Sequence, residues 1–186
     1  MFASLLEQIA LGLEARGIPY MLIGGQAVLL YGEPRLTRDI DITLGVGPER
    51  LADIQEMAAT WGWQALVDAA HEFVQRTLVF PCQDPRSGIR VDFIFSFSPY
   101  ERQALERVRR VPIGSAKVCF ASLEDTLIHK IVAGRPRDLE DARSIVLKNP
   151  GLDAAYVRRW LGEFERSLDQ PYRRIFEEIL ASAQVQ

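Results

Sequence analysis

The sequence predicts an α/β (α+β) fold: a mixed, antiparallel-rich sheet flanked by helices and followed by a C-terminal helical bundle. Short apolar or alternating runs bounded by glycine and proline indicate the strands. Apolar residues at helical spacing indicate the helices, and after residue 121 this is the only pattern present. We therefore expect an α/β domain over residues 1–121 and a helical region over 122–186, which could also pack as one domain.

The chain begins with an amphipathic helix over residues 2–15, which Gly17 ends. The apolar run Tyr20–Ile23 is short enough for a buried strand. Gly24-Gly25 breaks this run, and the apolar residues 26–31 are compatible with a helix. We expect the glycines to form a strand-to-helix turn, whose bare backbone N–H groups could bind phosphate.

Residues 39–42 are the next expected strand, and an apolar stripe over residues 51–61 predicts a helix. Three further strand candidates are residues 63–67, residues 73–80, which we expect to stop at Pro81, and residues 89–95. A helix over residues 100–108 and a hairpin or edge segment over residues 110–120 follow. Four helical stripes after residue 121 complete the chain.

Basic side chains are concentrated between the last sheet strand and the helical region. They are Arg102, Arg107, Arg109, Arg110 and Lys117. Such a cluster fits a solvated face as well as a surface that grips an RNA backbone.

The overall composition is that of an ordinary globular protein, with a net charge of −3 that argues against a surface coated in basic residues. Residues 1–99 carry seven basic and twelve acidic side chains, so this half is acidic, as a metal site requires. We expect no membrane span and no signal peptide. Cys82 and Cys119 do not make a disulfide framework, and we expect buried free thiols in a reducing cytoplasm.

Two carboxylates share one face of the strand that contains Asp39-Ile40-Asp41-Ile42. Side chains alternate across a strand, so Asp39 and Asp41 point one way and the two isoleucines the other. Like charges this close repel unless a cation or a shared proton neutralises them. Oxygen ligands in this arrangement suit Mg²⁺ with bound phosphates. The alternative is a surface strand whose aspartates face water.

Asp92 lies inside a strand that otherwise has the pattern of a core strand. An acid in such a place is seldom buried without a partner. It could be a third metal ligand. It could instead form a salt bridge with Arg38, Arg76 or Arg90.

A second constellation runs from Lys130 through the turn Gly134-Arg135-Pro136 to Asp138 and Asp141. The two aspartates share one helix face at i and i+3. Lys130 is a compact cation that could neutralise phosphate charge. The alternative is a helix-turn-helix held by the pairs Arg137–Asp141 and Arg135–Asp138.

The segment Ile23-Gly24-Gly25, thirteen residues and then Asp39-Ile40-Asp41-Ile42 resembles the signature of the DNA polymerase β-like nucleotidyltransferases. The later segment, from Lys130 to Asp141, resembles the AbiEii-like branch, of abortive-infection and toxin–antitoxin type. The resemblance implies a nucleotidyltransferase fold, and the site residues it implies follow by role. The metal ligands are Asp39, Asp41 and Asp92, the nucleotide-binding residues are Gly24, Gly25, Arg38, Lys130, Asp138 and Asp141, and the catalytic residues are Asp39, Asp41, Asp92 and Lys130.

The resemblance further implies transfer of a nucleoside monophosphate from an NTP to an acceptor hydroxyl, with Mg²⁺ or Mn²⁺ as cofactor. The acceptor would be an RNA end of tRNA type, a protein or a small molecule. An antitoxin partner protein is also implied, with no membrane partner. The alternative function is that of a non-catalytic nucleotide- or protein-binding relative in a toxin–antitoxin-like pair.

Overall fold

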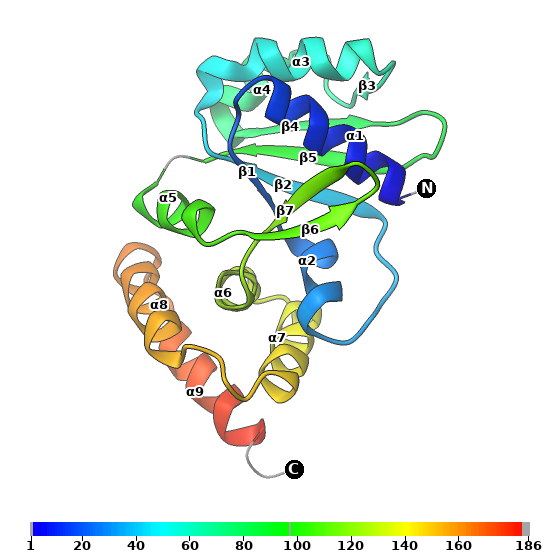
Figure 1. Ribbon diagram of the computed structural model, residues 1–186. Coiled ribbons are helices and arrows are strands. Elements are labelled where there is room, and N and C mark those ends of the chain that lie inside the picture. Colours follow the sequence, from blue (N-terminus) through cyan, green and yellow to red (C-terminus); the bar gives the residue numbers. More distant parts are fainter. Residues whose placement is uncertain (1, 97, 184–186) are drawn as a thin grey trace. The chain divides into compact units, whose positions relative to one another are not determined.

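The computed structural model describes residues 2–96 and 98–183 (Figure 1). The chain forms two compact units, which we call the sheet unit and the helical unit. The sheet unit contains Met1–Ile23 and Thr37–Phe120, and the helical unit contains Gly24–Leu36 and Ala121–Gln186. The segment after the first strand therefore belongs to the same unit as the C-terminal helices.

The sheet unit is built on seven strands in the order β3-β4-β5-β2-β1-β7-β6 within the described residues. Two neighbouring pairs, β2 with β5 and β1 with β7, are parallel, and the other four pairs are antiparallel. This confirms the predicted mixed, antiparallel-rich sheet. The strands are β1 (Tyr20–Leu22), β2 (Asp39–Leu44), β3 (Gln64–Ala65), β4 (Val79–Gln83), β5 (Arg90–Phe95), β6 (Arg109–Ile113) and β7 (Ala116–Phe120).

One face of β2 and β5 is fully buried, and the other, which carries the acidic residues, is partly exposed. Ile40, Ile42, Val91 and Phe93 are fully shielded from solvent. Burying apolar side chains of this size contributes roughly 1.5–3 kcal/mol each relative to leaving them exposed. The carboxylates on these same strands are therefore held on a rigid, well-packed support.

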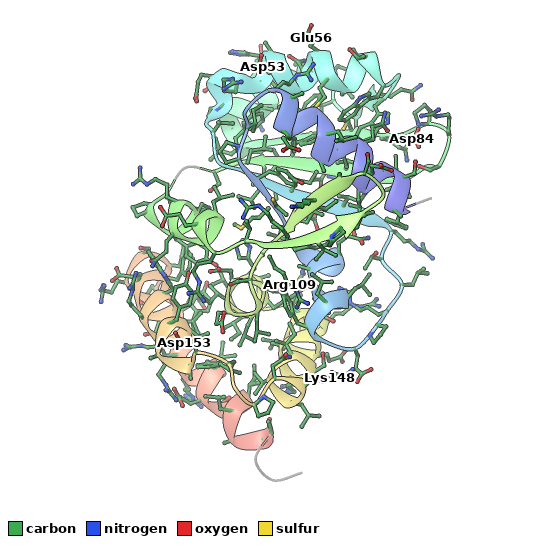
Figure 2. All side chains as sticks on the ribbon, in the orientation of Figure 1. Asp53, Glu56, Asp84, Arg109, Lys148 and Asp153 are labelled. Atoms are coloured by element: carbon green, nitrogen blue, oxygen red, sulfur yellow. The ribbon has the colours of Figure 1, made fainter. Side chains whose placement is uncertain are left out.

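Helices and one 3₁₀ turn complete the sheet unit. They are α1 (Phe2–Ala15), η1 (Pro48–Arg50), α3 (Leu51–Thr60), α4 (Ala70–Thr77) and α5 (Pro99–Glu106). Helix α1 packs against α3, where Gly12 admits the Trp61 ring so closely that a Cβ atom would clash. The outer side of α3 carries Glu56, which is exposed and labelled in Figure 2. A capping box of Ser98 and Glu101 starts α5.

The expected strand over residues 73–80 is wrong. Residues 70–77 form α4, and the strand that follows, β4, continues through Pro81 instead of stopping there. Leu78 ends α4 in the left-handed region, with φ 58°. Pro81 is tolerated because its peptide faces β3, where Leu66 donates to the Pro81 carbonyl at 2.9 Å. Since β3 is an edge strand of only two residues and Leu66 lies just beyond it, the missing N–H costs at most one bond at the end of this pairing.

The helical unit consists of α2 (Gly24–Tyr31), α6 (Leu123–Ala133), α7 (Pro136–Lys148), α8 (Ala154–Leu168) and α9 (Tyr172–Ala183). Ser122 caps α6 by accepting from the Asp125 N–H, and Gly134 ends it in the left-handed region. The interior is formed by buried apolar residues, namely Leu127, Ile128, Ile131, Ala142, Ile145, Val157, Leu161 and Phe176. The four helices predicted after residue 121 are thus confirmed.

None of the helices over residues 2–96 and 98–183 has the length and apolar character needed to cross a membrane. Cys82 is buried and Cys119 half-buried, and both are free thiols.

Candidate active site

The sheet unit brings two of the predicted carboxylates side by side. Strands β2 and β5 are parallel, and their register places Asp41 opposite Asp92 and Asp39 opposite Arg90. Asp39 is exposed and Asp41 is half-buried, whereas Ile40 between them is fully buried on the other face. The alternation predicted from the sequence therefore holds, and the neighbouring strand adds Asp92 to the same face.

Arg90 is the cation of this carboxylate group. Its Nε donates to Asp92 Oδ1 at 2.8 Å, which is one of the three pairings considered for Asp92. The hydrogen bond to Asp92 is the largest cause that raises the pKa of Arg90, and the charges of Asp92, Asp41 and Asp39 raise it further. All three acids thus act on a single guanidinium, which offsets part of their mutual repulsion.

The donor chemistry of this group fits a hard divalent cation. Carboxylate oxygens are the ligands that Mg²⁺ takes in proteins, and Asp41 and Asp92 come from rigid neighbouring strands. Throughout the described part of the chain, no three acidic, histidine or cysteine side chains are already gathered in a metal-binding geometry. The Arg90 side chain is about half exposed, so it is able to leave Asp92 for solvent.

The glycine pair opens α2 in the helical unit. Gly24 has φ +62°, a backbone conformation that residues other than glycine rarely adopt. Gly25 and Gln26 are buried behind it. The helix therefore begins at the first glycine, two residues earlier than the predicted start at Gln26. Its first N–H groups have no intrahelical acceptor, as at every helix start.

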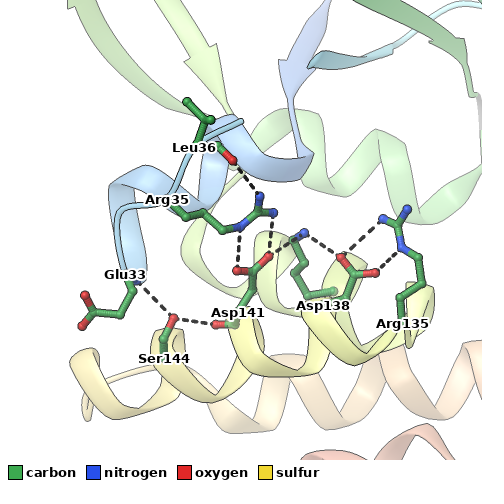
Figure 3. A network of polar contacts seen from close by, with 8 residues as sticks. Glu33, Arg35, Leu36, Arg135, Asp138, Asp141 and Ser144 are labelled. Carbon is green, nitrogen blue, oxygen red and sulfur yellow. Dashed lines mark hydrogen bonds and ion pairs between the residues drawn. The ribbon is translucent and has the colours of Figure 1, made fainter. Parts of the chain in front are cut away.

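Lys130 lies between two aspartates of a polar network in the helical unit, and Figure 3 labels its partners Asp138 and Asp141. Its side chain is 5% exposed, and Nζ lies 2.7 Å from Asp138 Oδ1 and 2.9 Å from Asp141 Oδ2. Both aspartates extend from one face of α7, as their i and i+3 spacing predicted. The lysine is thus held between two carboxylates of the neighbouring helix.

Two arginines close the network from either end. Arg35 binds Asp141 in a bidentate pair, with Nε and Nη2 both at 2.9 Å from its carboxylate oxygens. Arg135 binds Asp138 through Nε and Nη2. The predicted alternative of an Arg135–Asp138 pair is therefore present, whereas Asp141 pairs with Arg35 and Lys130. We call these five residues the Lys130 network.

The network lowers the pKa of both aspartates. Burial by itself raises the pKa of Asp138, but hydrogen bonds and charge from Arg135 and Lys130 outweigh it. Burial likewise raises the pKa of Asp141, and Arg35 and Lys130 outweigh it in the same way. Both carboxylates are therefore ionised near neutral pH, and the network has three positive and two negative groups.

The predicted site residues thus fall into two sets. The sheet unit holds Asp39, Asp41 and Asp92, together with the exposed Arg38. The helical unit holds Gly24, Gly25, Lys130, Asp138 and Asp141. The predicted site residues do not include Arg35, and they include Arg90 only as an alternative salt-bridge partner of Asp92.

Comparison with solved structures shows the nucleotidyltransferase fold. The structure of ANT(2'')-Ia in complex with adenylyl-2''-tobramycin matches with a TM-score of 0.61 at 17% identity, covering 89% of this chain and 97% of that chain. An antigenic nucleotidyltransferase-like protein from Paracoccidioides brasiliensis matches with a TM-score of 0.56 at 18% identity, covering 96% and 91%. JHP933 from Helicobacter pylori matches with a TM-score of 0.50 at 15% identity, covering 98% and 88%.

The family follows from a second comparison. The model of the nucleotidyl transferase AbiEii toxin family, of type IV toxin–antitoxin systems, matches residues 5–184. The chain therefore belongs to the AbiEii nucleotidyltransferase family, as its motifs predicted. No curated protein matches the chain. Family and fold together support a nucleotidyl transfer enzyme.

Proposed function

We propose that the protein is a metal-dependent enzyme that transfers a nucleoside monophosphate from an NTP to an acceptor hydroxyl and releases pyrophosphate. The observation that carries the proposal is the register of β2 and β5, which sets Asp41 beside Asp92 with Asp39 on the same face. Three acids on one face of a buried sheet repel one another, so the arrangement is stabilised by a bound cation.

In this proposal Asp41 and Asp92 hold Mg²⁺ or Mn²⁺, with Asp39 as a further oxygen donor. The ion, when bound, supplies positive charge that polarises phosphoryl oxygens and favours ionisation of the acceptor hydroxyl. Arg90 holds the Asp92 carboxylate in position while no cation is bound and moves to solvent when one binds. Buried apolar residues on the opposite face of both strands support the backbone that carries the carboxylates.

The helical unit, taken by itself, contains groups suited to phosphate. The first N–H groups of α2 follow Gly24, which itself carries no side chain that an anion would meet. The Lys130 network has one more positive than negative group, so its net charge favours an anionic ligand. We propose that Lys130 contacts phosphate while Asp138 and Asp141 hold it in place.

The test is transfer of label from each α-³²P NTP, with Mg²⁺, to total cellular RNA or total cellular protein. Wild-type protein should label one of these fractions and release pyrophosphate, and Asp41→Asn should abolish both. Asp53→Asn is the matched control, because Asp53 lies on α3 in a surface pair with Arg50.

The outcomes separate the two functions considered. Full transfer by Asp41→Asn would refute the assignment of the carboxylates. Absence of both labelling and pyrophosphate release by wild-type protein would support the alternative, a non-catalytic relative that binds nucleotide or protein. Membership of a toxin family also supports a proposed antitoxin partner, and co-expression with a neighbouring gene product would test for relief of growth inhibition.

A further inference from the structure

The sheet unit contains a cavity that the proposed reaction does not use. It has a volume of about 330 Å³, at the lower end of the range of small-molecule sites. Its apolar lining comes from Ala10, Ile18, Leu105 and Val108. Its lining also includes Tyr20 and Cys119 and three charged residues, Glu14, Arg110 and Lys117.

The two cations of this cavity lack acidic partners. Neither Arg110 nor Lys117 forms an ion pair with any described carboxylate, although arginines elsewhere in the chain are commonly paired. In the β6–β7 register Arg110 lies opposite Cys119, and Lys117 lies two residues before Cys119 on the same face. Arg110 and Lys117 therefore converge on one side of an apolar cavity.

Arg109 does not share this surface. It precedes Arg110 in β6, so the pleat turns its side chain to the opposite face. Arg109 is labelled in Figure 2. The basic stretch that the sequence presents as one cluster is thus divided between two faces, and only Arg110 and Lys117 line the cavity.

The cavity lies at the other end of the central strands from the carboxylates. In the β1–β2 register Tyr20 pairs with Leu44, the last residue of β2, whereas Asp39 is the first. A ligand in this cavity is therefore separate from the proposed metal-binding residues.

We propose that this cavity binds a small amphipathic anion, with an apolar body and a single carboxylate. The apolar lining takes the body, and Arg110 and Lys117 bind the carboxylate in charge-assisted hydrogen bonds. Glu14 also lines the cavity and disfavours a second negative charge, so a monoanion is preferred to a phosphate ester. This function is additional to nucleotidyl transfer.

Octanoate is a suitable probe, and octan-1-ol is its neutral counterpart with the same apolar chain. Binding is followed by ¹H–¹⁵N NMR at the Cys119 amide, which donates to the Tyr20 hydroxyl at 3.1 Å inside the cavity. We expect saturable shifts with octanoate and at least tenfold weaker binding of octan-1-ol. Arg110→Met should weaken octanoate binding about tenfold or more, the effect of losing one charge-assisted hydrogen bond.

Arg109→Met is the matched control, since it removes the same charge from the adjacent position on the other face. It should leave octanoate binding within about twofold of wild type. The proposal is overturned if octan-1-ol binds as tightly as octanoate, if Arg110→Met and Arg109→Met have equal effects, or if inorganic phosphate produces the same shifts. Nucleotidyl transfer is measured separately, so failure of this test leaves the carboxylate assignment standing.

Discussion

Replacing Lys130 by methionine tests whether the buried lysine also stabilises the fold. The substitution keeps the length and volume of the side chain and removes only the ammonium group, which lies 2.7 Å from Asp138 and 2.9 Å from Asp141. Since all three side chains are at most 6% exposed, solvent does not screen the pair. Removing one partner from a buried ion pair typically costs about 3–5 kcal/mol.

The remaining contacts place Lys130→Met at the lower end of that range. Asp138 retains Arg135 and Asp141 retains its bidentate pair with Arg35, so neither carboxylate is left without a cation. We expect a loss of about 3 kcal/mol in the free energy of unfolding. In a chain of this size that corresponds to a fall of roughly 6–12 °C in Tm.

Lys148→Met is the control for this measurement. Lys148 also lies on α7 and binds Glu33 at 2.7 Å, but these side chains are 41% and 68% exposed. A surface pair of this kind contributes about 0.2–1 kcal/mol. Thermal unfolding followed by circular dichroism compares the two variants. If Lys130→Met lowers Tm no more than Lys148→Met does, the buried ion pairs of Lys130 with Asp138 and Asp141 do not stabilise the fold.

Three more results are expected. Asp41→Asn should abolish Mg²⁺ binding in calorimetry yet slightly raise Tm without metal, because it relieves like-charge repulsion; unchanged Mg²⁺ affinity would contradict this. Arg90→Gln should tighten Mn²⁺ binding by paramagnetic titration, because Arg90 no longer competes for Asp92; weaker binding would instead make Arg90 a structural support of the site. The lowered pKa values of Asp138 and Asp141 give stability that is fully present above about pH 4, the unfolded pKa, and lost as pH falls through the lower folded values. Urea unfolding from pH 5 to pH 2.5 measures that loss, and an Asp138→Asn variant with the same pH dependence as wild type would refute its cause.

The fold class was predictable because the strongest local signals agree with the final structure. The alternation in Asp39-Ile40-Asp41-Ile42 gave the correct inner and outer faces of β2. The apolar stripes after residue 121 predict four helices, and these helices form because their apolar faces pack in the interior. Local pattern and global packing coincide in these elements.

Residues 73–80 show where local pattern is insufficient. The segment has the composition of a strand, with the apolar residues Phe73, Val74, Leu78, Val79 and Phe80. Residue propensity alone cannot distinguish one strand here from a helix followed by a strand. The break occurs at Leu78, a non-glycine residue in the left-handed region, which has no sequence signature. A proline at position 81 also argued against a continuing strand, and only the shortness of β3 explains why it is accepted.

The partners of the site residues could not be predicted either. The sequence predicts Arg137, four residues away, as the alternative partner of Asp141, because helical spacing reveals only local neighbours. Its bidentate partner is Arg35, which is 106 residues away in the chain. The adjacency of Asp41 and Asp92 likewise depends on the parallel pairing of β2 and β5, which no pattern within either strand specifies.

The position of α2 between β1 and β2 has a consequence for synthesis of the protein. This helix packs with α6 and α7, yet roughly ninety residues separate its end from the start of α6. At the usual rate of translation α2 is made roughly five to twenty seconds before its packing partners. During that interval α6 and α7 are not yet available to cover the apolar residues Ala27 and Val28, which are fully buried in the folded protein. We therefore expect α2 to be a segment on which chaperones act before the helical unit is complete.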